Sequence, residues 1–439
     1  MQPISIDLLL HCSWVLPIVP NNQILQDYSV AIDGGHILEI LPTESAKQKY
    51  HSEQTEELNR HILMPGLINT QCHSSLRLLR GIDQDLQHKH WLESDPSMPE
   101  TVFSDSKFIH DSVNIAIAEM IRTGTTCFAD MHSAGELFID IVRKTGIRSQ
   151  ASFTLQERSS IFGNNADDYL HRGLKLRDNQ SHHPRIKIAC SLSQICDIED
   201  ATLERLAAYA NELDLPIQIQ CNETLEAIET CFKKTGRRPL QHLNEKGLLL
   251  PETQLVGINY LNSEDSSILE ETNNHVVICP ELHSTVSSET RPLDSLVQAG
   301  VNLSLSTVNA VDNKDFNLMA VIKAAAAAIK ERCGKDSEQA AHQALRMATI
   351  NGAKALGWEN QIGSIEEGKY ADLIAVEIDS IHHQPLYNPA SQLVYSSTIS
   401  TVTHSWVAGQ PLLKAANLYT LDEQKLIQSA RDWGKKLVN

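Results

Sequence analysis

The sequence predicts a (β/α)₈ barrel joined to a small β-sandwich domain that both ends of the chain build. The prediction rests on the length of 439 residues, on a repeated strand-then-helix pattern in the middle, and on β-rich segments at both ends. We expect the β domain over 1–58 and 370–420, and the barrel over 59–369. A C-terminal helix is expected over 421–439.

The two ends of the chain carry segments with the character of β-strands. Near the N-terminus, residues 7–15, 29–32 and 37–41 are apolar runs that turn residues separate. Residues 372–376 and 402–407 have the same character. Because the N-terminal stretch is too small to be a stable domain alone, we expect both ends to complete one β domain together.

The middle of the chain alternates between strand and helix patterns. Residues 186–192 form a β run, helical spacing follows over 203–213, and 216–221 is β again. The alternation continues to a strand at 301–307 and a helix at 316–331. In a barrel of parallel strands the ligand site lies at the C-terminal ends of the strands, so the residues there are the candidates for chemistry.

Composition and charge limit the partners of this protein. The 37 basic and 55 acidic residues give a net charge of −18, which disfavours nucleic acid and anionic membranes and leaves small molecules as ligands. No window reaches the roughly 18 apolar residues that a membrane span needs. The first 46 residues contain no Lys or Arg, and the nine cysteines form no CxxC pair. These features are typical of a cytoplasmic protein with reduced thiols.

Two of the predicted strand ends concentrate polar side chains. Gln71 and His73 are two residues apart on the first barrel strand, so they share one face. Gln218 and Gln220 share a face on a later strand, and Glu223 follows directly. We expect these side chains to converge on the mouth of the barrel.

Several segments resemble the amidohydrolase superfamily. Residues 65–81 read PGLINTQCHSSLRLLRG, which is similar to the first-strand signature of its metal-dependent aminohydrolases, including methylthioadenosine/S-adenosylhomocysteine deaminases and triazine chlorohydrolases. Similar segments lie at 118–126, 238–240 and 363–373. The resemblance implies one divalent metal, held by an HxH pair on strand 1, histidines on strands 5 and 6, and an aspartate on strand 8. It also implies a glutamate, three residues after the strand 5 histidine, that moves a proton.

Most of these implied metal ligands are replaced here, whereas His73 and Glu223 match the family pattern. The replaced positions, in chain order, are Gln71, Gln220, Gly257 and Val308. Neutral amides are poor ligands for a hydrolytic zinc or iron ion, and one imidazole cannot hold either ion tightly. We therefore predict no bound metal and no other cofactor, although relatives hold a divalent metal.

Two segments that contact the substrate in the family also differ. The strand 4 run that usually reads APHAPYT is ACSLSQI over 189–195, which puts Leu192 near a substrate-contacting histidine position. The loop that usually reads NPxSNxKL is CPELHSTV over 279–286. The predicted ligand pocket consists of Gln71, Gln218, Gln220, Gly257, Leu192, Val308 and His283.

The retained and replaced residues admit more than one interpretation. His73 and Glu223 are either a metal-free acid/base pair or remnants in a polar pocket; we favour remnants, because water attack without a metal loses its main source of barrier reduction. The glutamines either surround a neutral heterocycle or satisfy one another's hydrogen bonds. Cys72 and Cys221 alternate away from these positions, so we expect them to be buried.

We therefore predict a non-hydrolytic pseudoenzyme that binds a small purine-like or other heterocycle, or that regulates an active paralogue. The alternative is an atypical hydrolase that uses His73 and Glu223 on C–N (non-peptide) or C–Cl bonds of a purine-like or triazine-like substrate. A third interpretation makes the barrel an oligomerisation module. The oligomeric state stays open, with a homo-oligomer among the alternatives.

Overall fold

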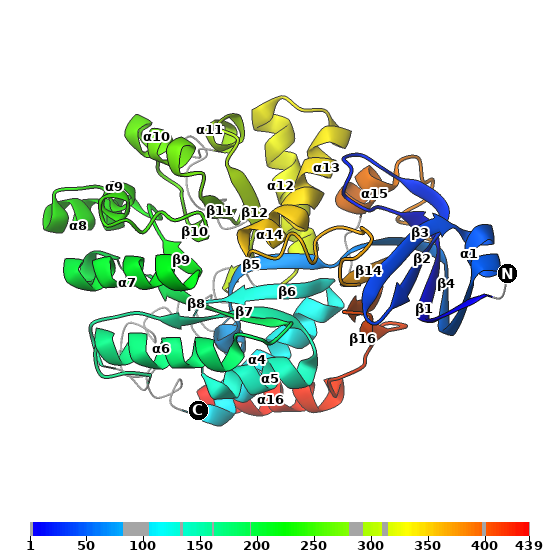
Figure 1. The fold of residues 1–439 in the computed structure, drawn as a ribbon, viewed down its shortest axis with the longest axis horizontal. Helices are drawn as coiled ribbons and strands as arrows, with labels where there is room; N and C mark the ends of the chain where they lie inside the picture. Colours follow the sequence, from blue (N-terminus) through cyan, green and yellow to red (C-terminus); the bar gives the residue numbers. More distant parts are fainter. Residues whose placement is uncertain are drawn as a thin grey trace.

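The computed structural model describes most of the chain, with gaps near the mouth of the barrel. The described residues are 3–81, 105–131, 135–159, 162–193, 195–280, 293–309, 315–396 and 401–438. The predicted pocket residue His283 lies outside them, and so does the side chain of Val308. Within these residues a barrel stands beside a separate β domain, as Figure 1 shows.

The β domain is one hydrogen-bonded sheet of eight strands in the order β17-β16-β15-β14-β4-β1-β2-β3. Its strands are β1 (Ile4–Val15), β2 (Leu25–Asp33), β3 (His36–Pro42), β4 (Tyr50–Pro65), β14 (Leu373–Glu377), β15 (Val402–Val407), β16 (Gln410–Lys414) and β17 (Asn417–Leu418). The antiparallel pairing of β4 with β14 joins the strands from the two ends of the chain. The expected composite domain is thereby confirmed.

The barrel consists of parallel strands whose residues are almost all buried, because one face meets the interior and the other meets helices. Its strands are β5 (Leu67–His73), β6 (Thr125–Asp130), β7 (Arg148–Thr154), β8 (Ile186–Leu192), β9 (Ile217–Gln220), β10 (Thr253–Val256), β11 (His275–Ile278), β12 (Asn302–Leu305) and β13 (Val308–Asn309). Each pairs in parallel with its neighbours in chain order from β5 to β12. The predicted (β/α)₈ class is confirmed.

The eighth strand of the barrel is split, and a side chain helps to close it. β12 pairs with β11, whereas β13 pairs with β5. Between them, Asn69 donates from Nδ2 to Thr307 Oγ1 at 2.8 Å and accepts from the Thr307 amide at 3.1 Å. The amide of Asn69 therefore bonds Thr307 in the short gap between the two pieces of the strand.

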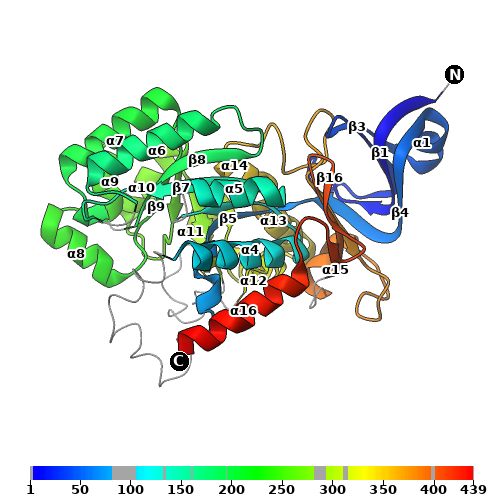
Figure 2. The ribbon, with the colours of Figure 1, turned by 90° about the horizontal axis from the view of Figure 1, so that it is seen from below.

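Helices surround the barrel and connect its consecutive strands, as the two ribbon views show (Figures 1 and 2). They are α4 (Ser106–Arg122), α5 (Glu136–Thr145), α6 (Ala166–Gln180), α7 (Asp200–Leu213), α8 (Leu225–Thr235), α9 (Pro239–Glu245), α10 (Ser263–Thr272), α11 (Leu293–Gln298), α12 (Leu318–Cys333), α13 (Ser337–Met347) and α14 (Ile350–Ala355). The largest apolar core lies between these helices and the outer faces of the strands. Among the described residues, no helix has the length and apolar run that crossing a bilayer requires.

The remaining helices lie outside the repeating units. α1 (Thr43–Lys49) and α15 (Pro389–Ser396) connect strands of the β domain, and the 3₁₀ turns η1 (Ser74–Leu79) and η2 (Ile195–Asp197) follow β5 and β8. The C-terminal helix α16 (Glu423–Val438) lies along α4, as Figure 2 shows. Its Trp433 packs edge-on against Phe108 and donates from Nε1 to Asp111 at 2.9 Å.

A buried ion pair joins the barrel to the start of β14. Arg148 on β7 donates from Nε and Nη2 to the two carboxylate oxygens of Asp372, at 2.8 and 3.1 Å. Both side chains are almost fully excluded from solvent. Burial opposes the charge of Arg148, but the attraction of Asp372 outweighs it and raises the pKa of the guanidinium. Asp372 also accepts from the Ala408 amide, so this pair fixes the β domain against the base of the barrel.

One disulfide corrects the expectation that all nine cysteines are reduced thiols. Cys196 in η2 and Cys231 in α8 are bonded, with Cα atoms 5.2 Å apart. They lie 35 residues apart in sequence, after the neighbouring strands β8 and β9. The other seven cysteines, all within described ranges, are not part of a disulfide.

Candidate functional site

Gln71 and His73 lie together at the end of β5, as their spacing predicts. The Gln71 Nε2 donates to His73 Nε2 at 2.9 Å and also contacts the Met131 sulfur at 3.7 Å. Both side chains are nearly fully buried. Because the two N–H groups of the amide point to these atoms, its oxygen points elsewhere. That oxygen, Gln71 Oε1, is buried without a hydrogen-bond partner among the described residues.

Gln218 lies deeper in the barrel and connects opposite strands. Its Nε2 donates to the carbonyl of Thr70 on β5 at 2.7 Å, and to Gln254 Oε1 on β10 at 3.0 Å. Gln254 in turn exchanges two hydrogen bonds with Gln150 on β7. Gln218 therefore belongs to an interior amide network, and its hydrogen bond to Thr70 holds the ends of β5 and β9 across from each other.

Glu223 lies just beyond β9, against the end of β10. A β-carbon placed on Gly257 would lie 3.2 Å from the Glu223 Cβ and 3.3 Å from its Cγ. Gly257 also has a left-handed backbone with φ of 78°, which an L side chain rarely adopts. The Glu223 side chain thus covers the position at which the family resemblance implies a histidine. Gln220, two residues after Gln218 on the interior face of β9, is partly buried.

Leu192 lies on the face of β8 opposite to the expected one. Ser191 Oγ donates to the carbonyl of Met131 at 2.7 Å, and Lys187 donates to the carbonyl of Leu356, so the odd-numbered residues of this strand face inward. Leu192 is fully buried in the apolar core under the helices. The prediction that Leu192 lines the ligand pocket does not match this placement, and Ser191 takes the inward position.

The two cysteines beside the ligand positions are structural, as expected. Cys72 and Cys221 are both buried. Burial strongly raises the pKa of each thiol, so neither forms a thiolate near neutral pH.

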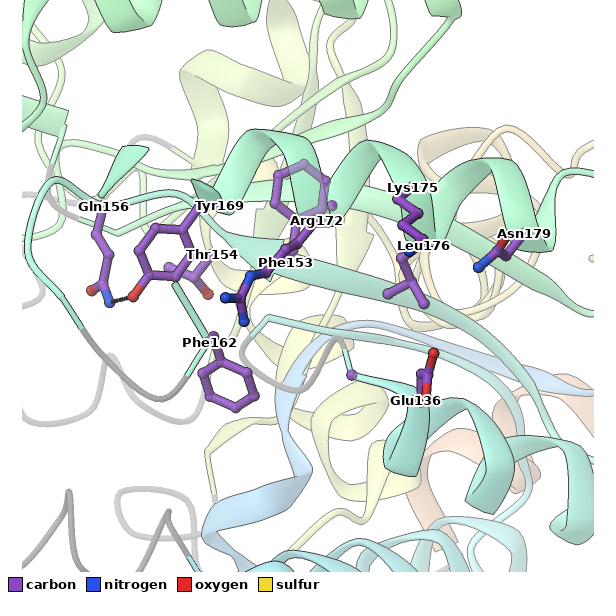
Figure 3. A pocket seen from close by; sticks show the side chains of 12 residues that line it. Glu136, Phe153, Thr154, Gln156, Phe162, Tyr169, Arg172, Lys175, Leu176 and Asn179 are labelled. Carbon is purple, nitrogen blue, oxygen red and sulfur yellow. Dashed lines mark hydrogen bonds between the residues drawn. The ribbon is translucent and has the colours of Figure 1, made fainter. Parts of the chain in front are cut away.

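A separate cavity of about 420 Å³ lies on the outer side of β7, between α5 and α6. Figure 3 shows Phe153, Phe162, Tyr169 and Arg172 among the side chains that line it. None of the described candidate site residues lines it. It is therefore not the site at the mouth of the barrel.

The fold and the polar strand ends define the class of this protein as a parallel (β/α)₈ barrel with its candidate site at the C-terminal ends of the strands. A family model described as "Amidohydrolase family" matches residues 62–412. The chain therefore belongs to the amidohydrolase family.

Two curated relatives share the whole length of the chain. A 5-methylthioadenosine/S-adenosylhomocysteine deaminase of Teredinibacter turnerae is 39% identical over 433 residues, which cover 99% of this chain and 98% of the relative. A deaminase of the same name from Saccharophagus degradans is 34% identical over 431 residues, covering 98% and 97%. These relatives contradict the expectation of a non-hydrolytic pseudoenzyme.

Solved structures agree with the family assignment. An adenosine deaminase from Xanthomonas campestris with bound zinc has a TM-score of 0.93 and 31% identity, with 99% of each chain covered. Atrazine chlorohydrolase TrzN from Arthrobacter aurescens TC1, in complex with zinc, has a TM-score of 0.86 and 21% identity, with 97% and 99% covered. This second likeness shows the fold alone.

The residues at the implied ligand positions do not fit a tetrahedral zinc site. His73 Nε2 already accepts from Gln71, and the positions on β9 and β10 hold an amide and a glycine. In the described ranges, no three His, Cys, Asp or Glu residues are grouped so that they could hold a metal ion. The difference from the zinc-bound structures lies in the four replaced ligand positions, not in the fold. These positions are Gln71, Gln220, Gly257 and Val308.

The absence of a tightly bound metal stays a prediction. We expect elemental analysis of protein purified without a chelator and without a metal-binding tag to find zinc, iron and manganese far below one ion per chain. The physical reason is that one imidazole and neutral amides bind these ions weakly. Near-stoichiometric metal would contradict the prediction and would assign ligands to residues outside the described ranges.

Sequence reasoning missed the groups that hold the candidate site in place. The Thr70 carbonyl accepts from Gln218, the Met131 sulfur contacts Gln71, and Ser191 donates to the Met131 carbonyl; none of these contacts leaves a motif. Asn222, directly before Glu223, has a left-handed backbone, a state that Asn tolerates better than most residues. That tolerance is the one signal in the sequence that could have marked a special position next to Glu223.

Proposed function

We propose that this protein is a hydrolytic deaminase that removes the exocyclic amino group of an adenine-type nucleoside. The proposal is the C–N branch of the alternative hydrolase hypothesis. Support comes from the names of the full-length relatives at 34 and 39% identity and of the adenosine deaminase at 31%. Within the chain itself, Glu223 and His73 are retained where the family places its proton-transfer group and its second strand 1 histidine.

The open acceptor on Gln71 is the structural observation that carries the proposal. A buried amide oxygen without a partner favours a ligand that brings an N–H donor, because leaving the oxygen unpaired costs about 1 to 3 kcal/mol. The amino group of an adenine ring is such a donor. His73 accepts from the same amide and so fixes which way the oxygen points.

The reaction needs one proton-transfer group within hydrogen-bond reach of both the attacking water and the amino nitrogen. Glu223 takes a proton from the attacking water, whose oxygen forms a bond to the ring carbon that carries the amino group. The same carboxyl group then returns a proton to the amino nitrogen, the C–N bond breaks, and ammonia leaves; the remaining hydroxyl proton moves to the ring nitrogen as the ring carbonyl forms. The hydrogen bond from Gln218 to Thr70 keeps β9, and therefore Glu223, across the mouth from Gln71.

The test is an ammonia assay with adenosine, 5′-methylthioadenosine and S-adenosylhomocysteine as substrates. We expect at least one of them to release ammonia in a one-to-one ratio with a 6-oxopurine product, which chromatography identifies. Saturable binding of these nucleosides without any ammonia would contradict the proposal. Cytosine nucleosides serve as the control, because their smaller ring presents its amino group at a different distance from the strand ends.

A further inference from the structure

The backbone turn that carries Glu223 has an unusual conformation at the preceding residue. The strand ladder ends with the Cys221 amide donating to the Val256 carbonyl. Asn222 then adopts a left-handed conformation with φ of 54°, which directs the chain toward the end of β10. The position of Glu223 therefore depends on what holds Asn222.

The Asn222 side chain is anchored to a buried charge. Its Nδ2 donates to Asp265 Oδ2 at 3.2 Å and to the Tyr260 carbonyl at 3.1 Å. Asp265 is fully buried and accepts from Arg238 Nε at 2.8 Å. Arg238 also donates to the Tyr260 carbonyl, so the same two acceptors serve both side chains. We call this network the Asn222–Asp265–Arg238 anchor.

A second asparagine, Asn259, donates hydrogen bonds to two consecutive backbone carbonyls of the turn. The Asn259 amide donates to the Asn222 carbonyl at 3.2 Å, and its Nδ2 donates to the Glu223 carbonyl at 3.0 Å. Asn259 follows Gly257 by two residues. The loop after β10 therefore both hydrogen-bonds the backbone of Glu223 and contacts the Glu223 side chain. Asn259 thus holds the main chain of Glu223, and Gly257 packs against its side chain.

We propose that the Asn222–Asp265–Arg238 anchor is a positioning device for Glu223, which sets where its carboxyl group stands at the mouth of the barrel. The proposal rests on the proposed deaminase function, in which Glu223 moves the proton. None of the three anchor residues touches the reacting atoms. They act through the backbone of Glu223, and a carboxyl group displaced by about 1 Å loses rate on the order of 100-fold.

Asn222→Gly is the variant that isolates the anchor. Glycine adopts the left-handed backbone freely, so the substitution removes the side-chain hydrogen bonds without adding backbone strain. Both acceptors keep Arg238 as a donor, and neither is left unpaired. Asp265 is the less suitable target, because its carboxylate also caps α10 by accepting from the Asn262 amide.

Asn273→Gly is the matched control. Asn273 has a left-handed backbone with φ of 53°, almost the same as that of Asn222, and it is exposed at the end of α10. We expect Asn222→Gly to lower kcat about 10- to 100-fold with KM little changed, whereas Asn273→Gly keeps the wild-type kcat. The melting temperatures of the two variants are expected to be similar. A large loss of stability in Asn222→Gly alone, with kcat unchanged, would overturn the proposal.

A double variant and a crystal structure complete the test. In the Glu223→Gln background, Asn222→Gly is expected to have no further effect on kcat, because the group that it positions is already removed. A full additional loss of rate would overturn the proposal. Crystal structures of wild type and Asn222→Gly are expected to show the Glu223 carboxyl group displaced, and an unchanged carboxyl position would overturn the proposal even if no nucleoside is deaminated. Failure of the ammonia assay in wild type counts against the proposed function instead.

Discussion

Glu223→Gln is expected to lower kcat for nucleoside deamination about 100- to 10,000-fold, with little change in KM. The substitution keeps the size and hydrogen-bonding capacity of the side chain but removes the group that accepts a proton near neutral pH. Packing against Gly257 is preserved, because the amide has the same shape as the carboxyl group. The measurement is steady-state ammonia release, with nucleoside binding measured separately on the same variant.

Glu226→Gln is the matched control for this prediction. Glu226 lies in the first turn of α8, three residues after Glu223, and is exposed. The Glu226→Gln substitution removes one negative charge from the same region but keeps the candidate proton-transfer group. We therefore expect the wild-type rate of ammonia release. If Glu223→Gln also kept the wild-type rate, Glu223 would be a remnant and the proton would have to move through another residue.

Asp372→Asn is expected to lower the free energy of unfolding by about 3 to 5 kcal/mol, the cost of leaving a buried partner charge uncompensated. In the native protein the two oxygens of Asp372 bind Arg148, while Trp358 and Tyr370 flank the guanidinium at 5.5 and 5.1 Å. Neither aromatic ring replaces a negative charge. The measurement is chemical denaturation monitored both by fluorescence and by circular dichroism, since the pair joins two domains.

Asp379→Asn provides the comparison for the buried pair. Asp379 forms an ion pair with Arg60 at 3.0 Å, with side chains 46% and 70% exposed. Water screens such a pair, so its removal is expected to cost less than about 1 kcal/mol. Equal losses in the two variants would show that Arg148 finds another counter-charge, and that the junction does not depend on Asp372.

The fold was predictable because its signals are local. Strand and helix periodicities repeat along the barrel, and the predicted strand at 186–192 matches β8. The long-range contacts left no such signal. Arg148 and Asp372 are 224 residues apart, and Asn222 and Asp265 lie on different strand-helix units. Pairing of this kind depends on barrel register, which no pattern in one sequence specifies.

Only part of the placement of the candidate site residues was predictable. Gln71 and His73 share a face as alternation requires, whereas Leu192 faces the helices because the register of β8 was placed one residue off. The larger error was functional. We took replacement of metal ligands to mean loss of hydrolysis, yet ligand identity at four positions says nothing about the other residues that relatives share over their full length.

The composite sheet also constrains the order in which this protein can be completed during synthesis. β4 pairs with β1 on one side, but its other neighbour, β14, leaves the ribosome only after about 300 further residues. Until then the edge of β4 at His61–Pro65 lacks its partner strand, and unpaired edges of this kind are where chains associate with one another. We therefore expect this edge of β4 to stay open for the whole time that the barrel is being made, until β14 emerges and pairs with it.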